Sequence, residues 1–224
     1  MLLSAEHLSI NFGSRQLLDD VNFYLNEGDK VGVIGINGTG KSTFLKVLSG
    51  VTEPDGGTIS RNPNVQVSLL PQNPAMEESA TVLEQVFLHF PAEFRELNEY
   101  EAKAMLNRLG ITDFAQKVGT LSGGQRKRVA LAAALIHPAD VLILDEPTRG
   151  VDVGAKAEIY QIMDELTRAG KSIILISTDL PEVIGMSDRV VIMREGHTVL
   201  EIPKSEMNQE IILAHASGGV SENE

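Results

Sequence analysis

The chain of 224 residues is long enough for one large domain or two small ones, and its hydrophobic share of 42% and charged share of 22% are those of an ordinary soluble globular protein. Asp and Glu outnumber Lys and Arg by 31 to 19, and an acidic protein with a net charge of −12 does not attract nucleic acid backbones or anionic lipids over long range, so we expect no direct binding of nucleic acid. Because the surface is acidic, any bound anion must be held by a local, preorganised site. The absence of cysteine excludes disulfides and cysteine-based metal sites.

The first third of the sequence predicts strands around one glycine-rich loop. Residues 21–26 alternate apolar and polar side chains with the period of a half-buried strand, and a turn follows at residues 27–29. Residues 30–34 form a short apolar strand that leads into the glycine-rich stretch, and the apolar residues after it predict a helix that ends at Gly50. Residues 65–69 alternate again.

The middle of the sequence mixes helices with buried strands. Apolar residues recur at three- and four-residue spacing over residues 81–109, and a second helix is predicted beyond Gly123. The continuous apolar runs 141–144 and 173–176 are typical of strands buried on both faces, and the helix predicted between them ends at Gly170.

The end of the sequence predicts a hairpin from residues 190–193 and 197–202, followed by a flexible tail at residues 217–224. Strands that alternate with helices indicate an α/β fold with a mainly parallel sheet. Residues from about 74 to 120 form a helical insertion beside that sheet. We therefore predict a single domain over residues 1–224.

Residues 35–42 match the phosphate-binding pattern G-x-x-x-x-G-K-S and lie between a predicted strand and a predicted helix, as the pattern requires. Their backbone N–H groups can surround an anion at a helix N-terminus, where the helix dipole favours negative charge. Lys41 can reach the β- and γ-phosphates of a nucleotide, and Ser42 can bind Mg²⁺. The alternative is a glycine turn with an exposed lysine. The residues expected to contact the nucleotide are Gly35, Asn37, Gly38, Thr39, Gly40, Lys41, Ser42 and Thr43.

Two carboxylates directly follow the apolar run 141–144. Asp145 and Glu146 would stand at the carboxyl end of that strand, where ligands bind in parallel α/β sheets. Asp145 is placed there to hold Mg²⁺ through water, and Glu146 to polarise the attacking water. The alternative is an acidic pair that ends a strand.

The segment Leu121-Ser122-Gly123-Gly124-Gln125 would on its own be a helix N-cap with a flexible approach. Combined with the two elements above, it resembles the signature LSGGQ of the ABC ATPase superfamily, and the resemblance covers essentially the whole chain. It implies an α/β P-loop NTPase fold with a RecA-like core, an N-terminal antiparallel β region and a helical subdomain. It also implies that Mg-ATP lies at a head-to-tail interface between two copies, or between this chain and a related partner. The signature residues that would contact the ATP of the opposite subunit are Ser122, Gly123, Gly124 and Gln125.

The resemblance assigns roles to three further residues. Phe12 matches the aromatic residue that stacks on adenine, with a core phenylalanine as the alternative. Gln72 matches the glutamine that senses Mg²⁺ and joins the two lobes, with an ordinary surface glutamine as the alternative. Asp152 matches a loop that crosses the dimer interface, and it can also cap the helix that follows.

Residues 126–128 are a basic trio that we interpret as a solvated helix face.

Thr178 stands where the superfamily normally has a histidine that contacts the γ-phosphate. A hydroxyl can donate a hydrogen bond but has no positive charge, and charge-assisted hydrogen bonds are roughly twice as strong. The hypothesis is that ATP binds well and that turnover is slow unless a partner completes the site.

The resemblance changes along the chain. Up to about Thr148 the sequence resembles the first ATPase domain of ABC-F proteins, the soluble translation-factor branch, and from Arg149 it resembles the second ATPase domain of sugar importers. The first resemblance rests on residues 17–21, 35–40 and 132–138, and the second on residues 146–156 and 180–189. The change indicates a chimera, designed or recombined, joined at residues 146–149.

Three functions follow from the resemblance. The first is the energy-coupling subunit of a sugar importer, which would dock on a membrane-embedded transporter subunit beside Gln72. The second is an ABC-F-like, ATP-gated factor that associates with the ribosome, and the third is an engineered scaffold that binds nucleotide and has no natural partner.

The longest apolar run, Val129–Ile136, is far shorter than the roughly 18 residues of a membrane span, and the N-terminus does not resemble a signal peptide. We therefore expect a cytoplasmic protein that reaches the inner face of a membrane only through a partner.

Overall fold

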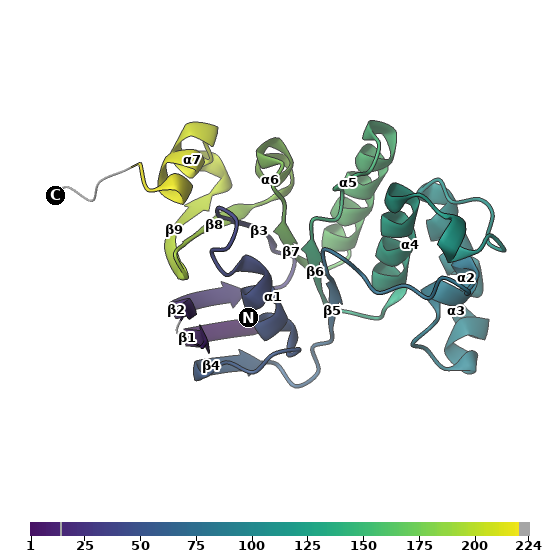
Figure 1. Ribbon diagram of the computed structural model, residues 1–224, viewed down its shortest axis with the longest axis horizontal. Helices are drawn as coiled ribbons and strands as arrows, with labels where there is room; N and C mark the ends of the chain where they lie inside the picture. Colours follow the sequence, from purple (N-terminus) through teal and green to yellow (C-terminus); the bar gives the residue numbers. More distant parts are fainter. Residues whose placement is uncertain (14, 220–224) are drawn as a thin grey trace.

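The computed structural model describes residues 1–13 and 15–219, which form two sheets and the helices around them (Figure 1). The larger sheet has six strands in the order β5-β6-β7-β3-β8-β9, and the smaller has three in the order β2-β1-β4. The strands are β1 (Leu3–Phe12), β2 (Arg15–Leu25), β3 (Lys30–Ile34), β4 (Gly56–Arg61), β5 (Val67–Leu70), β6 (Val141–Asp145), β7 (Ser172–Ile176), β8 (Arg189–Arg194) and β9 (His197–Pro203). The helices are α1 (Lys41–Ser49), α2 (Val82–Val86), α3 (Ala92–Arg108), α4 (Gly123–Ile136), α5 (Val153–Arg168), α6 (Leu180–Met186) and α7 (Gln209–Ser217), with short 3₁₀ turns at Val118–Thr120 and Lys204–Glu206.

The larger sheet is parallel except at one edge. β5, β6, β7, β3 and β8 pair in parallel, and β9 returns antiparallel to β8 through the predicted hairpin. The smaller sheet is antiparallel throughout, since β1 pairs with both β2 and β4. This arrangement confirms the predicted α/β fold with an N-terminal antiparallel region.

The continuous apolar runs of the central strands are explained by the two faces of the larger sheet. In β6, Leu142 and Leu144 belong to the core beneath α4 and α5, whereas Val141 and Ile143 belong to the core shared with α1 and the smaller sheet. Each successive side chain therefore packs into a different core, so every position in such a strand must be apolar.

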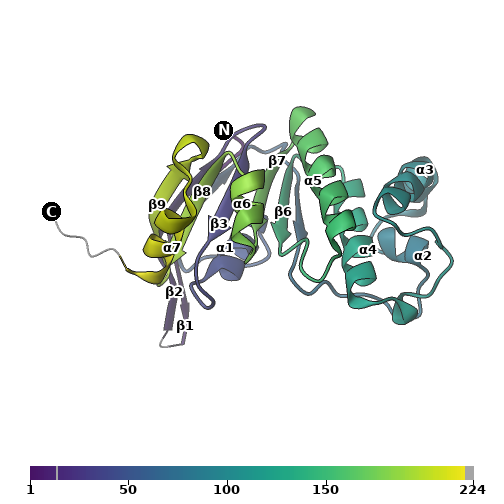
Figure 2. The ribbon, with the colours of Figure 1, turned by 90° about the horizontal axis from the view of Figure 1, so that it is seen from above.

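Helices α2, α3 and α4 form a lobe at the end of the molecule opposite β9 (Figure 2). The predicted helical stretch 81–109 is two helices, because the chain turns over residues 87–91 and Pro91 caps the start of α3. Proline has no N–H and tolerates only the first turn of a helix, so it marks a boundary that the apolar spacing alone does not reveal.

Two other expectations need correction. The predicted tail includes Ser217, which is the last residue of α7, and Gly218 caps that helix in the left-handed conformation; residues 220–224 lie outside the described residues. The basic trio 126–128 is not a solvated face, because Lys127 is buried with 7% of its surface exposed.

The chimera stays a prediction, and its joint would lie just after β6, whose pairing with β5 and β7 is in register along the strand.

Candidate functional site

The loop between β3 and α1 has the conformation that its glycines allow. Gly38 has φ of 85° and Gly40 has φ of 93°, both in the left-handed region that side chains with a Cβ rarely adopt. A Cβ on Gly40 would also overlap the carbonyl oxygen of Leu17. The loop therefore brings its backbone close to β2 and ends at the N-terminus of α1, where an anion is stabilised by the helix dipole.

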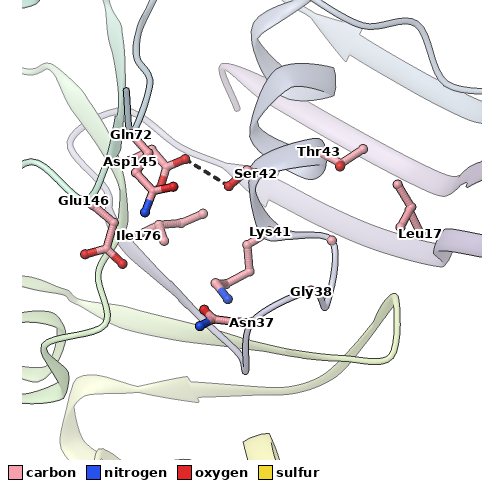
Figure 3. Close-up of a pocket in the computed structure, with 11 residues that line it drawn as sticks. Leu17, Asn37, Gly38, Lys41, Ser42, Thr43, Gln72, Asp145, Glu146 and Ile176 are labelled. Carbon is pink, nitrogen blue, oxygen red and sulfur yellow. Dashed lines mark hydrogen bonds between the residues drawn. The ribbon is translucent and has the colours of Figure 1, made fainter. Parts of the chain in front are cut away.

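A cavity of about 290 Å³ lies beside this loop (Figure 3). It joins four parts of the fold: Leu17 of β2, the loop and first turn of α1, the segment after β5, and the carboxyl ends of β6 and β7. The residues that line it are Leu17, Asn37, Gly38, Gly40, Lys41, Ser42, Thr43, Gln72, Asp145, Glu146 and Ile176. The structure thus brings together most of the predicted phosphate-loop residues, the predicted glutamine and both carboxylates.

Lys41 is the first residue of α1, and its side chain contacts the loop that precedes the helix. Its Nζ donates hydrogen bonds to the carbonyl oxygens of Gly35, at 2.6 Å, and Ile36, at 2.9 Å. Burial lowers the pKa of Lys41, and the nearby carboxylates of Glu146 and Asp145 act in the opposite direction. The cavity therefore contains a partly desolvated cation at one side and two carboxylates at the other.

The oxygen groups opposite Lys41 suit Mg²⁺. Ser42 Oγ donates a 3.0 Å hydrogen bond to Asp145 Oδ2, drawn as the dashed line in Figure 3, and Gln72 lines the same cavity. Mg²⁺ prefers oxygen ligands and is usually held by one or two carboxylates together with substrate phosphates. Within residues 1–13 and 15–219, no group of three or more His, Asp or Glu could hold a metal ion alone. These oxygen groups therefore fit a cation whose coordination is completed by the phosphates of a nucleotide.

Glu146 has an unusual backbone. Its φ is 53°, in the left-handed region, and its N–H donates a 2.9 Å hydrogen bond to the carbonyl oxygen of Ile176. The residue is 5% exposed, and its Oε2 accepts a 3.2 Å hydrogen bond from Thr178 Oγ1. The structure therefore places Thr178 beside the predicted catalytic carboxylate, as a neutral hydrogen-bond donor.

A buried carboxylate supports the loop that contains Thr178. Glu182, in α6, accepts hydrogen bonds from Thr148 Oγ1, at 2.8 Å, and from Ser177 Oγ. Burial and the Glu182 carboxylate raise the pKa of Tyr160 to about 12. This cluster could not be predicted from the sequence, because Thr148 lies 34 residues from Glu182 and the residues match no motif.

The signature segment lies outside the phosphate-loop cavity. Ser122 and Gln125 form a capping box at the start of α4, in which Gln125 N–H donates to Ser122 Oγ at 3.3 Å and Ser122 N–H donates to Gln125 Oε1 at 2.9 Å. Gly123 and Gly124 line a second cavity of about 810 Å³. Gln72 lines both cavities. Within one chain, the phosphate-loop half and the signature half of the predicted ATP site therefore lie in two adjacent cavities and do not form a single pocket.

Three other predicted residues have clear positions. Phe12 is 77% exposed at the end of β1 and is absent from the lining of the phosphate-loop cavity, so the alternative of a core phenylalanine is wrong. Asp152 caps α5 through a 3.0 Å hydrogen bond from the N–H of Ala155. Thr39 is buried at 4% exposure and donates to the carbonyl oxygen of Ile36, which makes it a support of the loop.

Comparison with known proteins agrees with this geometry. The family model described as ABC transporter matches residues 18–149, which is more than half of the chain. The chain belongs to the ABC transporter family. Among residues 1–13 and 15–219, this ABC domain has no helix with the length and apolar character needed to cross a membrane.

The curated relatives of this ABC domain include two ribose import proteins. The "Ribose import ATP-binding protein RbsA" of Oceanobacillus iheyensis is 36% identical over 93% of the chain, and "RbsA 1" of Rhizobium meliloti is 33% identical over 89%. The chain spans about half the length of these relatives, at 47% and 44%.

Solved structures share the fold of this ABC domain. A nucleotide-free ATP-binding cassette from an ABC transporter superposes with a TM-score of 0.79 at 26% identity, covering 99% of this chain and 97% of that one. A dimeric ATP-binding cassette in a post-hydrolysis state with ADP and Pi superposes with a TM-score of 0.80 at 23% identity, covering 91% and 99%. These matches confirm the predicted P-loop NTPase fold.

Proposed function

We propose that this ABC domain binds Mg-ATP between two head-to-tail copies, hydrolyses it, and thereby drives a membrane-embedded partner of a sugar importer. The observation that carries the proposal is the division of the predicted ATP residues between two cavities of one chain, with Gln72 at the boundary. A second copy facing the first would bring its Ser122 and Gly124 to the phosphate-loop cavity. The sugar-importer partner is inferred from the resemblance of residues 146–156 and 180–189 to sugar importers and from the names of the relatives.

The polar groups that face the phosphates and the metal ion have defined tasks in this proposal. Lys41 and the backbone N–H groups of the loop bind the β- and γ-phosphates, and Ser42, Asp145 and Gln72 hold Mg²⁺. The metal ion supplies neutralisation of the charge that develops on the phosphates. Phe12, which is exposed, is free to stack on the adenine.

Hydrolysis in this proposal depends on Glu146. Its carboxylate orients a water molecule in line with the γ-phosphate and takes up a proton as the water attacks. Thr178 holds Oε2 of that carboxylate by a 3.2 Å hydrogen bond, and can donate to the γ-phosphate only by giving up this bond. Because the hydroxyl adds no positive charge, we propose slow turnover in the isolated domain.

Turnover should depend on protein concentration. Where most of the protein is monomeric, we expect ATP turnover per subunit to rise about 10-fold for each 10-fold increase in concentration, because mass action forms the dimer. The measurement is steady-state release of phosphate from Mg-ATP across a wide range of protein concentration, with sedimentation to report dimer formation. Turnover per subunit that stays constant while the protein remains monomeric would contradict the composite site.

Removal of the Thr178 hydroxyl should have a small effect. A neutral hydrogen bond contributes about 0.5–1.5 kcal/mol, so we expect Thr178→Ala to lower kcat by roughly 2- to 10-fold, with ATP affinity unchanged. Thr178→Ser, which keeps the hydroxyl, is the matched control. Fast turnover by the wild-type domain that is abolished in Thr178→Ala would show that the hydroxyl replaces the missing histidine by itself, and would overturn this view.

A further inference from the structure

Lys127 is a buried lysine that no family motif assigns. It is the fifth residue of α4, the helix that begins at the signature segment, and only 7% of its surface is exposed. An ammonium group removed from water costs several kcal/mol unless hydrogen bonds replace its hydration. The structure must therefore supply partners for it.

The partners of Lys127 are three main-chain carbonyl oxygens. Its Nζ donates to Pro71 O at 3.3 Å, to Gln72 O at 2.9 Å and to Asp145 O at 3.1 Å. An ammonium has three protons, so this set uses all of its donors. Two acceptors belong to the segment after β5, and the third belongs to the peptide bond that joins Asp145 to Glu146.

The two arginines beside Lys127 contact different parts of the chain. Arg126 pairs with Glu78 and donates to Gly119 O, whereas Arg128 donates to Leu109 O. Those contacts lie within the helical lobe, and Arg128 also pairs with Asp152 at the start of α5, at 3.8 Å. Lys127 is therefore the member of the trio whose ammonium reaches from α4 to the cavity-lining segments of the larger sheet.

We propose that Lys127 is a positioning residue, whose ammonium fixes the Gln72 backbone and the Asp145–Glu146 peptide relative to the signature helix. The inference rests on the proposed ATP hydrolysis for its kinetic consequences, but not for the contacts themselves. A main-chain carbonyl cannot move far from Nζ without breaking its hydrogen bond. The ammonium thereby sets the spacing between Gln72 and the carboxylates of Asp145 and Glu146, which line the phosphate-loop cavity.

The electrostatics agree with this role. Burial lowers the pKa of Lys127, and the carboxylates of Asp145 and Glu146 act against that effect. A positive charge behind the two carboxylates also offsets part of their mutual repulsion when no cation is bound between them. Lys127 would therefore support the ion-binding side of the cavity from within the protein.

The test compares Lys127→Met, which removes all three donors, with Lys127→Gln, which keeps an amide donor group. We expect Lys127→Met to lower kcat by roughly 10- to 100-fold, because misplacement of reacting groups by about 1 Å has effects of that size, and to leave the KM for ATP within a factor of about 3. Lys127→Gln should recover part of the rate. Lys103→Met is the matched control, because Lys103 forms a half-exposed i,i+4 pair with Glu99 on α3 and such helix pairs contribute little.

Two measurements separate this proposal from the proposed function. Hydrogen–deuterium exchange should rise over residues 70–73 in Lys127→Met, and the Mg²⁺ concentration needed for binding of a fluorescent ATP analogue should increase at least about 3-fold. Both measurements apply even if the wild-type domain hydrolyses no ATP, which would refute the proposed function alone. Thermal unfolding shows which variants fold. If Lys127→Met does not fold, the same measurements on Lys127→Gln test the positioning role. A folded variant with unchanged exchange, Mg²⁺ dependence and kcat would refute the positioning role.

Discussion

Replacement of Glu146 by Gln is expected to reduce ATP hydrolysis by roughly 100- to 10,000-fold, the usual contribution of a positioned general base. Gln keeps the size and shape of the side chain and can still bond to Thr178, but it cannot accept a proton from the attacking water. Binding of Mg-ATP should be retained, because the phosphates are held by the loop before α1. The measurement is phosphate release at saturating Mg-ATP, together with equilibrium binding of labelled ATP.

The chain contains a close control for that substitution. Glu195, in the turn between β8 and β9, has φ of 50°, nearly the same left-handed conformation as the φ of 53° at Glu146, but it is exposed and does not line the phosphate-loop cavity. Glu195→Gln therefore tests the same chemical change on the same type of backbone. We expect it to hydrolyse ATP at the wild-type rate. Equal losses of activity in the two variants would show that the effect is not specific to the carboxylate in the cavity.

Much of the fold could be predicted because local patterns agree with the tertiary structure. The apolar runs that became β6 and β7 must be apolar at every position, since each side of the sheet is covered by a separate core. The phosphate loop was predictable because left-handed glycines, a following lysine and a helix start occur in consecutive residues. Such features need no knowledge of distant contacts.

What could not be predicted depends on contacts between distant segments. Glu182 and Thr148 are 34 residues apart, and Lys127 and Gln72 are 55 residues apart. In the sequence, Lys127 is one of three consecutive basic residues, and nothing in that run shows that its side chain turns inward. The helix α3 boundary was missed for a different reason, because Pro91 breaks the chain inside an otherwise helical pattern.

The signature segment shows that a structural role and a functional role can belong to the same residues. Ser122 Oγ accepts the capping hydrogen bond from Gln125, yet its own proton is left for another acceptor. The alternative interpretation of this segment as an N-cap is therefore correct for the single chain and compatible with contact to an ATP of a second copy. The same holds for Asp152, which caps α5.

Loss of the Lys41 ammonium should weaken ATP binding more than any other change in the loop. Hydrogen bonds to charged groups contribute about 1.5–3 kcal/mol, so we expect Lys41→Met to raise the Kd for ATP by roughly 10- to 100-fold. The fold should persist, because the donors of Lys41 satisfy only the carbonyl oxygens of Gly35 and Ile36 at an open cavity. Lys46→Met is the matched control on the exposed side of the same helix, and it should bind ATP normally. Tight ATP binding by Lys41→Met would contradict the phosphate-loop assignment, since the remaining N–H groups would then suffice without the cation.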